Sequence, residues 1–296
     1  MIAYDGDSPV GQVASIPCKY LMPDEKEPVT LTLTMNVCVA PKYRGMGILT
    51  ELMDQIHKVD QYSVPFSIGI PNDQSMKGHL KNKYYPLPMT LLIRPVILSN
   101  YFSSSLVRKL AKPFDALWRK GADVEYQEYS KRFDERFDDL TNSIHQKAIR
   151  QLRNLDFLNW RYIDNPRRKY KIFAALDKDG QQVQGYLVAR VTDVFETKLG
   201  LIVDFVARND SQPVKNLILN ALRYFWESKV TFAAAACFAE CIEYRLLRRA
   251  GFFVAPDRFR PHPLALCVKS LDEARGGQDL LNPNSWFFMI GDYETF

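Results

Sequence analysis

The sequence predicts an α/β protein of the α+β kind, made of two tandem domains in which helices flank a mixed, mostly antiparallel sheet. One observation is an apolar strand at 29–39 that runs through a glycine-containing turn into a helix starting near residue 47. Another is a repeated order of elements within the 296 residues. The order strand, strand, strand, helix, strand, helix, strand occurs in 1–97 and again from 131 onward, which is typical of a duplication.

The first repeat has a pattern of alternating apolar residues and helical spacings that places its elements in order. Strands are expected near 2–4, 10–16, 29–39, 65–70 and 89–94, and helices near 47–60 and 73–83.

The turn between the third strand and the first helix has the properties of an anion site. Gly45 and Gly47 lack Cβ atoms, so backbone N–H groups there can approach an anion closely, and the new helix contributes its positive dipole end. Arg44 adds a planar donor group suited to phosphate. We interpret the turn as a pyrophosphate cradle; the alternative is that the two glycines only permit a tight turn.

These residues resemble a known family. The segment from Tyr43 to Ile48 is similar to the acetyl-CoA loop of the GNAT acetyltransferases, whose pattern is [Q/R]-x-x-G-x-[G/A]. Arg44 fills its first position and Gly47 its invariant glycine, whereas Leu49 stands where the family has Gly or Ala. Downstream, the segment 72–75 resembles the start of the family's Asn-x-x-[Ala/Ser] helix, with Lys83-Tyr84 in place of its terminal Gly-Phe.

The resemblance implies that acetyl-CoA, or another acyl-CoA, is the co-substrate. The cofactor-binding positions that it implies lie in the third strand, the glycine turn and the following helix starts: Val37, Val39, Arg44, Gly45, Met46, Gly47, Ile48, Leu49 and Asn72.

Acyl transfer to an amine needs a polarised carbonyl, a deprotonated amine and a proton for the leaving thiolate. In the family the proton donor is a Tyr a few residues before Gly-Phe, and aligning Tyr84 with that Phe puts His79 at its position. The predicted catalytic residues are therefore His79 and Tyr84, with Tyr85 as a further candidate. The alternative is that His79 is an inert helical side chain and the tyrosines are core aromatics. Cys38, in an apolar strand without a neighbouring His, is expected to be a packing residue.

The second repeat lacks the glycine pair. Its predicted elements are strands at 133–140, 170–176, 183–192, 199–207, 231–236 and 286–290, and helices at 148–162, 213–228 and 239–250. The segment 206–213 takes the place of the phosphate loop, and Pro213 removes a donor amide from it. We therefore expect 1–97 to be the acyl-CoA-binding domain, 98–130 a connector, and 131–296 a GNAT-like domain without the standard cofactor loop. A GNAT domain normally begins with a further strand and two helices, so the first domain is expected to be shortened at its N-terminus.

The connector contains a basic amphipathic helix over 106–118. It either touches an anionic membrane surface or a partner, or it packs its apolar face on the sheet as an interdomain connector.

Composition narrows the functional classes. A net charge of +5 suits an anionic cofactor but is too small to predict nucleic-acid binding. No apolar run is long enough for a membrane span and no secretory signal is visible, so the expected location is cytoplasmic. Five cysteines and four histidines without a C-x-x-C motif predict reduced thiols and no metal site.

The predicted function is acyl-CoA-dependent N-acyltransfer to a small-molecule amine. The segments 155–170 and 286–292 resemble proteins of bacterial polysaccharide and cell-envelope gene clusters, which implies an amino sugar or an envelope precursor as acceptor. Two alternatives stay open. One is an aminoacyl-tRNA-dependent transferase of cell-wall synthesis, for which the basic runs 167–169 and 245–249 would be contacts. The other is a non-catalytic binding protein with a vestigial fold.

Overall fold

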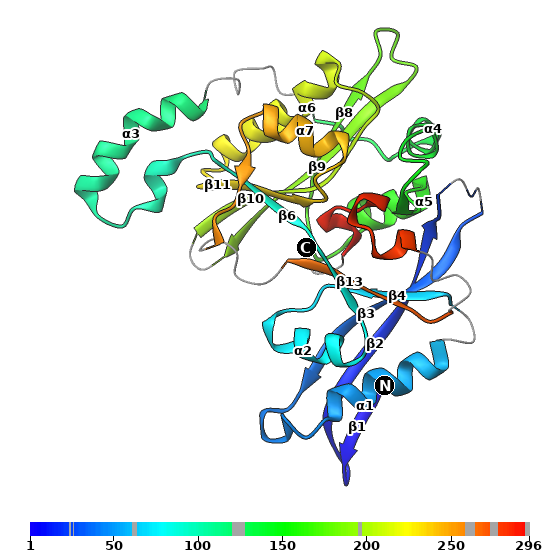
Figure 1. Cartoon of the computed structure of the whole chain (residues 1–296). Coiled ribbons are helices and arrows are strands. Elements are labelled where there is room, and N and C mark those ends of the chain that lie inside the picture. Colours follow the sequence, from blue (N-terminus) through cyan, green and yellow to red (C-terminus); the bar gives the residue numbers. More distant parts are fainter. Residues whose placement is uncertain are drawn as a thin grey trace. The chain divides into compact units, whose positions relative to one another are not determined.

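The computed structural model describes residues 1–23, 25, 27–60, 64–119, 128–194, 197–257, 264–272 and 278–293. These residues fall into two compact units, each drawn from separate stretches of the chain (Figure 1). Unit 1 comprises Met1–Met89, Gln146–Leu152 and Asp257–Phe287, and unit 2 comprises Thr90–His145, Arg153–Pro256 and Phe288–Phe296. Each unit combines stretches from both ends of the sequence, so the units do not correspond one to one with the predicted domains 1–97, 98–130 and 131–296. Those domain boundaries stay a prediction.

Unit 1 is built on a mixed sheet with the strand order β14-β7-β2-β3-β4-β13-β5, and β1 pairs with β2 at its side. The strands are β1 (Ile2–Asp5), β2 (Ser8–Leu21), β3 (Val29–Val39), β4 (Phe66–Gly69), β5 (Tyr85–Pro88), β7 (Ile149–Gln151), β13 (Ala265–Ser270) and β14 (Trp286–Phe287). Short 3₁₀ turns at Pro41–Tyr43, Gln278–Leu281 and Pro283–Ser285 complete it.

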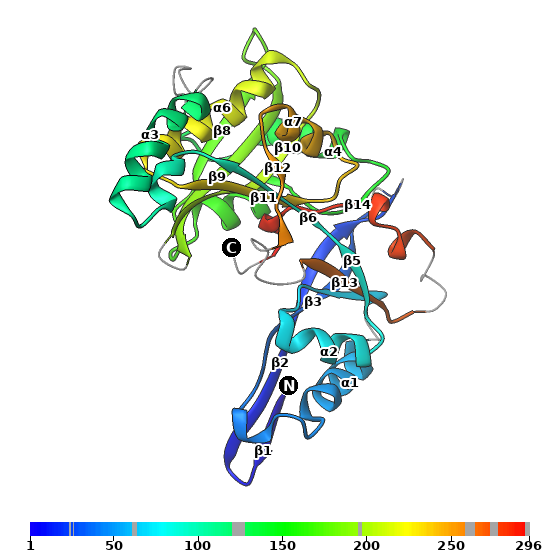
Figure 2. The same ribbon diagram turned by 60° about the vertical axis from the view of Figure 1, so that its left-hand side comes forward.

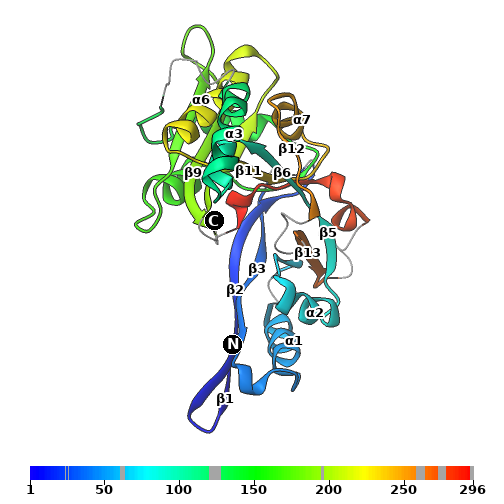
Figure 3. The same ribbon diagram turned by 90° about the vertical axis from the view of Figure 1, so that its left-hand side faces the viewer.

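Two helices, α1 (Ile48–Asp60) and α2 (Asp73–Lys81), lie on the same side of the long strands β2 and β3 (Figure 3). Their contact is close because α2 has no side chain at Gly78, where a Cβ would come within 2.6 Å of Leu49 Cδ2. Beneath them lies an apolar cluster that includes Leu52 and Met53 of α1. Burial of such side chains, worth about 1.5–3 kcal/mol each, holds the two helices on the sheet.

Unit 2 contains a second mixed sheet, in the order β12-β6-β11-β10-β9-β8. Its strands are β6 (Thr90–Pro95), β8 (Lys171–Leu176), β9 (Val183–Val194), β10 (Thr197–Ala207), β11 (Phe232–Cys237) and β12 (Phe253–Val254). Its helical segments are a 3₁₀ turn at Leu98–Tyr101, α3 (Ser105–Arg119), α4 (Glu135–Ser143), α5 (Leu155–Leu158), a π-helix at Asn159–Ile163, α6 (Gln212–Glu227), α7 (Ile242–Arg249) and a 3₁₀ turn at Ile290–Asp292. Figure 2 shows α6 beside β8 and β9.

The order of elements is repeated, because β1-β2-β3-α1-β4-α2-β5 in the first half has the same order as β8-β9-β10-α6-β11-α7-β12 in the second. The last strand of each repeat was expected elsewhere, at 89–94 and 286–290, and the first of these is β6 of unit 2. The sequence did not predict that the halves exchange a strand. β6 follows the first repeat but pairs between β11 and β12, and β13 follows the second repeat but pairs between β4 and β5. In Figure 1 the orange β13 accordingly lies among blue and cyan strands. Each sheet therefore needs residues from both halves of the sequence.

Several predicted elements differ from the structure. Residues 133–140 were expected as a strand, but Asp134 caps the helix α4 through its side chain, and Phe137 and Leu140 form the buried face of that helix. The expected helix at 148–162 is instead β7, α5 and a π-helix. The expected strand 286–290 is reduced to β14 and a bridge between Cys237 and Met289.

The amphipathic segment 106–118 lies in a helix, as predicted, but several apolar side chains in its described part face solvent. Leu106 and Leu110 are 67% and 66% exposed, and Phe114 is 56% exposed. The helix instead buries Ala111 and Asp115, whose carboxylate accepts the Ser99 amide at 3.0 Å. Among the described helices none is both long and apolar enough to cross a membrane.

Candidate functional site

The parallel strands β3 and β4 separate at a defined point in unit 1. They pair at Thr32–Ser67, Leu33–Ile68 and Thr34–Gly69, and beyond Thr34 the strand β3 continues with β2 as its partner. The chain after Gly69 turns away to begin α2. The two strands therefore diverge beyond Thr34 and Gly69, next to the predicted binding positions Val37 and Val39, and we call this point of divergence the opening.

A bulge in β3 marks this opening. Gln12 pairs with Cys38 and Ala14 pairs with Met35, so β3 has one more residue than β2 between the two pairs. Asn36 takes up this extra length with φ 52°, and its carbonyl accepts Gln12 Nε2 at 3.3 Å. Such bulges re-aim the following residues. Val37 thereby packs on the apolar cluster under α1, whereas Cys38 is an exposed free thiol and so not the buried packing residue that was expected.

The glycine turn presents free backbone donors. Gly45 and Gly47 both have φ 83°, a conformation that favours glycine, and a Cβ built at either would meet no atom within 4 Å. The first helical hydrogen bond runs from the Glu51 amide to the Gly47 carbonyl at 3.1 Å. Among the bonds of the described residues, none is donated by the amides of 45–50. A helix start with its N–H groups unpaired is suited to an anion.

The side chains of the turn leave this space open. Arg44 is exposed and donates Nε to the Val39 carbonyl at 3.1 Å, which fixes its stem beside the turn. Met46 is 69% exposed. Ile48 and Leu49 point the other way, into the apolar cluster, so only their amides can face a ligand. The departure from the family pattern at Leu49 is tolerated because Gly78 leaves room for it.

Asn72 occupies the N-cap of α2. Its side chain accepts the amides of Gln74 at 3.1 Å and Ser75 at 3.0 Å, and the Asn72 amide donates to the Ser75 hydroxyl oxygen at 3.1 Å. This capping box provides hydrogen-bond partners for backbone N–H groups at the start of α2. Asn72 is exposed and follows Gly69, the last paired residue of β4, after Ile70 and Pro71.

His79 lies at the point where the strands separate. It is 2% exposed, and its Nε2 would lie 3.0 Å from a Cβ on Gly69, which places this nitrogen against β4 at the last pair. Its Nδ1 lies 3.0 Å from the Ser75 carbonyl, which can only accept, so Nδ1 carries the proton and Nε2 carries a lone pair. That Nε2 is buried without a partner among the described residues. Burial lowers the pKa of His79 despite its bond to Ser75, so the ring is neutral near pH 7.

Tyr84 is linked to the same point through its hydroxyl. The ring is 3% exposed, and its centroid lies 4.9 Å from that of His79. The hydroxyl is 2.8 Å from Thr34 Oγ1, 2.8 Å from Ser67 Oγ and 2.8 Å from His57 Nε2. Burial raises the pKa of Tyr84 to about 12, so the hydroxyl is protonated and can donate. Tyr85, in contrast, is 50% exposed on β5.

The corresponding opening in unit 2 is filled by the chain itself. β10 and β11 pair at Leu199–Phe232 through Leu201–Ala234 and then separate, and β10 has a bulge just beyond. The segment 289–292 enters there. Met289 bridges to Cys237 of β11, and a Cβ at Gly291 would lie 3.0 Å from the Val203 carbonyl of β10.

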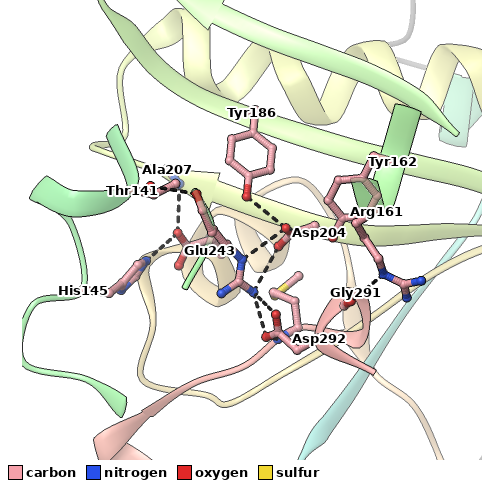
Figure 4. Close-up of polar contacts among 12 residues, drawn as sticks. Thr141, His145, Arg161, Tyr162, Tyr186, Asp204, Ala207, Glu243, Gly291 and Asp292 are labelled. Atoms are coloured by element: carbon pink, nitrogen blue, oxygen red, sulfur yellow. Dashed lines mark hydrogen bonds and ion pairs between the residues drawn. The ribbon is translucent and has the colours of Figure 1, made fainter. Parts of the chain in front are cut away.

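Buried charges hold this segment in place (Figure 4). Arg153 Nη2 donates to Asp292 Oδ2 at 2.7 Å, and Arg153 Nε donates to Asp204 Oδ2 at 3.2 Å. Tyr162 and Tyr186 donate their hydroxyls to the same Asp204 oxygen at 3.0 and 2.9 Å. Two carboxylates share one cation, and burial raises the pKa of Asp292 to about 6 against the opposing effect of Arg153.

The backbone N–H groups at the end of β10 and in the turn after it also have partners within the chain. Glu243, fully buried, accepts the amide of Ala207 at 2.9 Å and His145 Nε2 at 2.9 Å. In the turn that follows, the Arg208 amide donates to the Gln184 carbonyl and the Ser211 amide to Asn209 Oδ1, each at 2.9 Å. These donors are paired, whereas those of the glycine turn in unit 1 are free.

Comparison with known proteins agrees with this geometry. Residues 1–80 match the family model described as the acetyltransferase (GNAT) domain. The chain has a GNAT acyltransferase fold. A search of curated proteins found no match in sequence.

Solved structures match over most of the chain. A GCN5-related N-acetyltransferase from Anabaena variabilis superposes with a TM-score of 0.61 at 14% identity, covering 92% of this chain and 62% of that one. A second such enzyme, from Kribbella flavida, gives 0.53 at 15% identity and covers 90% and 58%. The Saccharomyces cerevisiae N-myristoyltransferase with bound myristoyl-CoA gives 0.59 at 10% identity and covers 88% and 66%. At these identities the likeness is one of fold, and the chain spans about three fifths of the length of the two acetyltransferases.

The structure thus brings the predicted residues of the glycine turn, His79 and Tyr84 to one side of one sheet. Sequence reasoning missed His57, which contacts the Tyr84 hydroxyl, and Lys269, whose Nζ lies 3.0 Å from His57 Nδ1. Neither belongs to a recognisable motif, and Lys269 lies on β13, whose place in this sheet follows from the strand exchange. Within the described residues, no group of three or more His, Cys, Asp or Glu side chains is placed to hold a metal ion.

Proposed function

We propose that this protein is an N-acyltransferase that binds acetyl-CoA, or another acyl-CoA, at the glycine turn of unit 1 and transfers the acyl group to a small-molecule amine. The supporting observation is the set of unpaired amides at 45–50 at the start of α1, in a turn where Cβ atoms at Gly45 and Gly47 would meet no atom within 4 Å. The side chain of Arg44 adds positive charge beside it. Anionic phosphates are the ligands that such a helix start favours.

The opening between β3 and β4 supports the position of the thioester. Bound there, an acyl-CoA supplies the activated acyl group. The bulge at Asn36 turns the backbone of β3 beyond the last pair, so that amides near Val37 and Val39 are candidates to polarise the carbonyl. In unit 2 the matching opening is filled by 289–292, which favours one acyl-CoA for each chain.

Two neighbouring groups suit the two proton transfers of the reaction. Neutral His79 has a buried Nε2 lone pair without a partner among the described residues where β3 and β4 separate, so it is our candidate for the acceptor of the proton that the amine loses. Protonated Tyr84 is a source of the proton that the leaving thiolate needs. His79 was predicted from the sequence as that donor, but its tautomer favours the opposite role.

The acceptor is proposed to be a small amine, with an amino sugar or an envelope precursor as the classes that the sequence resemblance implies. We propose no single length for the acyl group, because the matching structures include both acetyltransferases and a protein with bound myristoyl-CoA.

Calorimetric titration of the full chain with acetyl-CoA and with myristoyl-CoA tests the proposal. We expect saturable binding of at least one of them with one site for each chain. Transfer is then tested with a panel of amines, by following the release of free thiol. Absence of binding would reject the proposal, and binding without transfer to any amine would favour the non-catalytic alternative. Binding of charged tRNA in place of acyl-CoA would favour the aminoacyl transferase.

A further inference from the structure

Beneath α1 a line of polar side chains runs from β13 to the opening between β3 and β4. Lys269 Nζ lies 3.0 Å from His57 Nδ1, and His57 Nε2 lies 2.8 Å from the Tyr84 hydroxyl. The Tyr84 hydroxyl in turn lies 2.8 Å from Thr34 Oγ1. Lys269 is partly exposed, whereas His57, Tyr84 and Thr34 are all less than 5% exposed. The line therefore runs from a partly exposed lysine to the last paired residue of β3 before the strands separate.

The sheet places these groups on one side. Thr32 pairs with Ser67, and Ser67 pairs with Lys269 across β4 and β13, so the three side chains point to the same face. Thr34, two residues beyond Thr32, lies on that face as well. His57 reaches this row from the last turn of α1.

Chemistry fixes the direction of the bonds between Lys269 and Tyr84. A lysine ammonium has three donors and no acceptor, so His57 Nδ1 must accept from Lys269. His57 then carries its proton on Nε2 and donates it to the Tyr84 oxygen. Tyr84 consequently donates its own proton onward, to Thr34 or to Ser67, both within 2.8 Å. Burial and the charge of Lys269 lower the pKa of His57 to about 3, which keeps the ring neutral and its Nδ1 lone pair available.

We propose that Lys269 and His57 are positioning residues that deliver a proton through Tyr84 and Thr34 to the thiolate released at the opening. Thr34 is the terminal member because it belongs to the last pair before the strands separate. The Thr34 O–H bond breaks as an S–H bond forms, and Thr34 takes the Tyr84 proton. Tyr84 takes the His57 Nε2 proton, and His57 Nδ1 takes one from Lys269. The lysine amine recovers its proton from water, so one proton moves from solvent to sulfur. His57 is left protonated on Nδ1, and the next cycle begins once exchange of its ring proton restores the Nε2–H tautomer. This inference rests on the proposed acyl-CoA function.

The direction of donation also predicts that two buried histidines have opposite tautomers. His57 carries its proton on Nε2, because Lys269 donates to its Nδ1. His79 carries its proton on Nδ1, because the Ser75 carbonyl accepts from it.

Long-range ¹H–¹⁵N NMR spectra of the ¹⁵N-labelled full chain at pH 7 test the direction without any substrate, with His57→Gln and His79→Gln variants used for assignment. The expected result is an Nε2–H tautomer for His57 and an Nδ1–H tautomer for His79. An Nδ1–H tautomer or a protonated ring at His57 would overturn the proposal.

Turnover with acetyl-CoA and hydroxylamine, a small amine that needs no dedicated acceptor pocket, tests the delivery. Lys269→Met and Thr34→Val should each lower kcat about tenfold or more while the KM for acetyl-CoA stays within about twofold. Lys269→Arg, which keeps a donor, should retain most of the turnover. Lys58→Met removes an exposed lysine that pairs with Asp54 and should change nothing.

An unchanged kcat in Lys269→Met, or no acceleration by wild-type protein that binds acetyl-CoA, would overturn the delivery proposal and leave cofactor binding intact. Absence of acetyl-CoA and myristoyl-CoA binding in calorimetry would instead reject the proposed function, and the delivery step with it. The two failures are thereby distinguished.

Discussion

Replacing Gly47 by alanine tests the glycine turn with little steric disturbance. Gly47 has φ 83° and open space at its missing Cβ, so the substitution introduces backbone strain without a clash. A non-glycine residue in this region costs about 1–2 kcal/mol. If the turn relaxes to relieve that strain, the amides at 45–50 move, and each charge-assisted hydrogen bond lost to phosphate costs about 1.5–3 kcal/mol. We therefore expect Gly47→Ala to weaken acyl-CoA binding about 10- to 150-fold.

The matched control is Gly6→Ala in the hairpin between β1 and β2. Gly6 also has a positive φ, 57°, and no atom within 4 Å of its Cβ position. Both variants should lose similar stability in urea denaturation, because they share the same backbone cost. Only Gly47→Ala should weaken the calorimetric affinity for acetyl-CoA. A folded Gly47→Ala protein whose affinity stays within twofold of wild type would refute the cradle.

Other predictions concern the buried groups. His79→Gln should lower turnover about 10²- to 10⁴-fold, measured by thiol release, with a nearly unchanged acyl-CoA dissociation constant; a loss below tenfold would exclude a proton-transfer role. Arg153→Met leaves two buried carboxylates without their cation and should cost about 3–5 kcal/mol in urea denaturation, whereas Arg132→Met at an exposed pair should cost little. The folded pKa of His57 lies below its unfolded value, so the unfolded chain binds more protons and stability falls as pH decreases from about 6.5. His57→Gln should reduce that slope between pH 6.5 and 5 by about 1 kcal/mol per pH unit, and an unchanged slope would show that this ring is not buried neutral.

The sequence predicted the elements that carry a local signal. The strand ending at Val39, the turn at Gly45 and Gly47 and the helix after it were predicted because hydrophobic period and glycine placement are local properties. The helix that begins after Asn72 was predicted for the same reason, since its cap lies in the adjacent residues.

Features that depend on distant pairing were not predicted. β13 is a short apolar run, and nothing near it indicates that it pairs between β4 and β5. In the segment 133–140, Phe133 and Phe137 are four residues apart, a spacing that fits one face of a strand or of a helix. The segment forms a helix because Asp134 caps it and Phe137 is buried by tertiary packing. The role of Lys269 follows from the strand exchange and is therefore invisible in the sequence around it.

The exchange also affects how unit 2 can be studied. A fragment covering 131–296 would lack β6, the strand between β11 and β12, and would retain β13 without its partners. Binding by unit 2 is therefore best measured in the full chain, where the prediction is that it takes no acyl-CoA because 289–292 fills its opening.

Hydrogen exchange of the full chain with and without saturating acetyl-CoA tests the central claim most directly, because the claim concerns backbone amides. The account predicts that bound acetyl-CoA protects the amides of 44–50, with further protection near 36–39, and leaves 206–213 unchanged. Protection at 206–213, or none at 44–50 under conditions where acetyl-CoA binds, would contradict it.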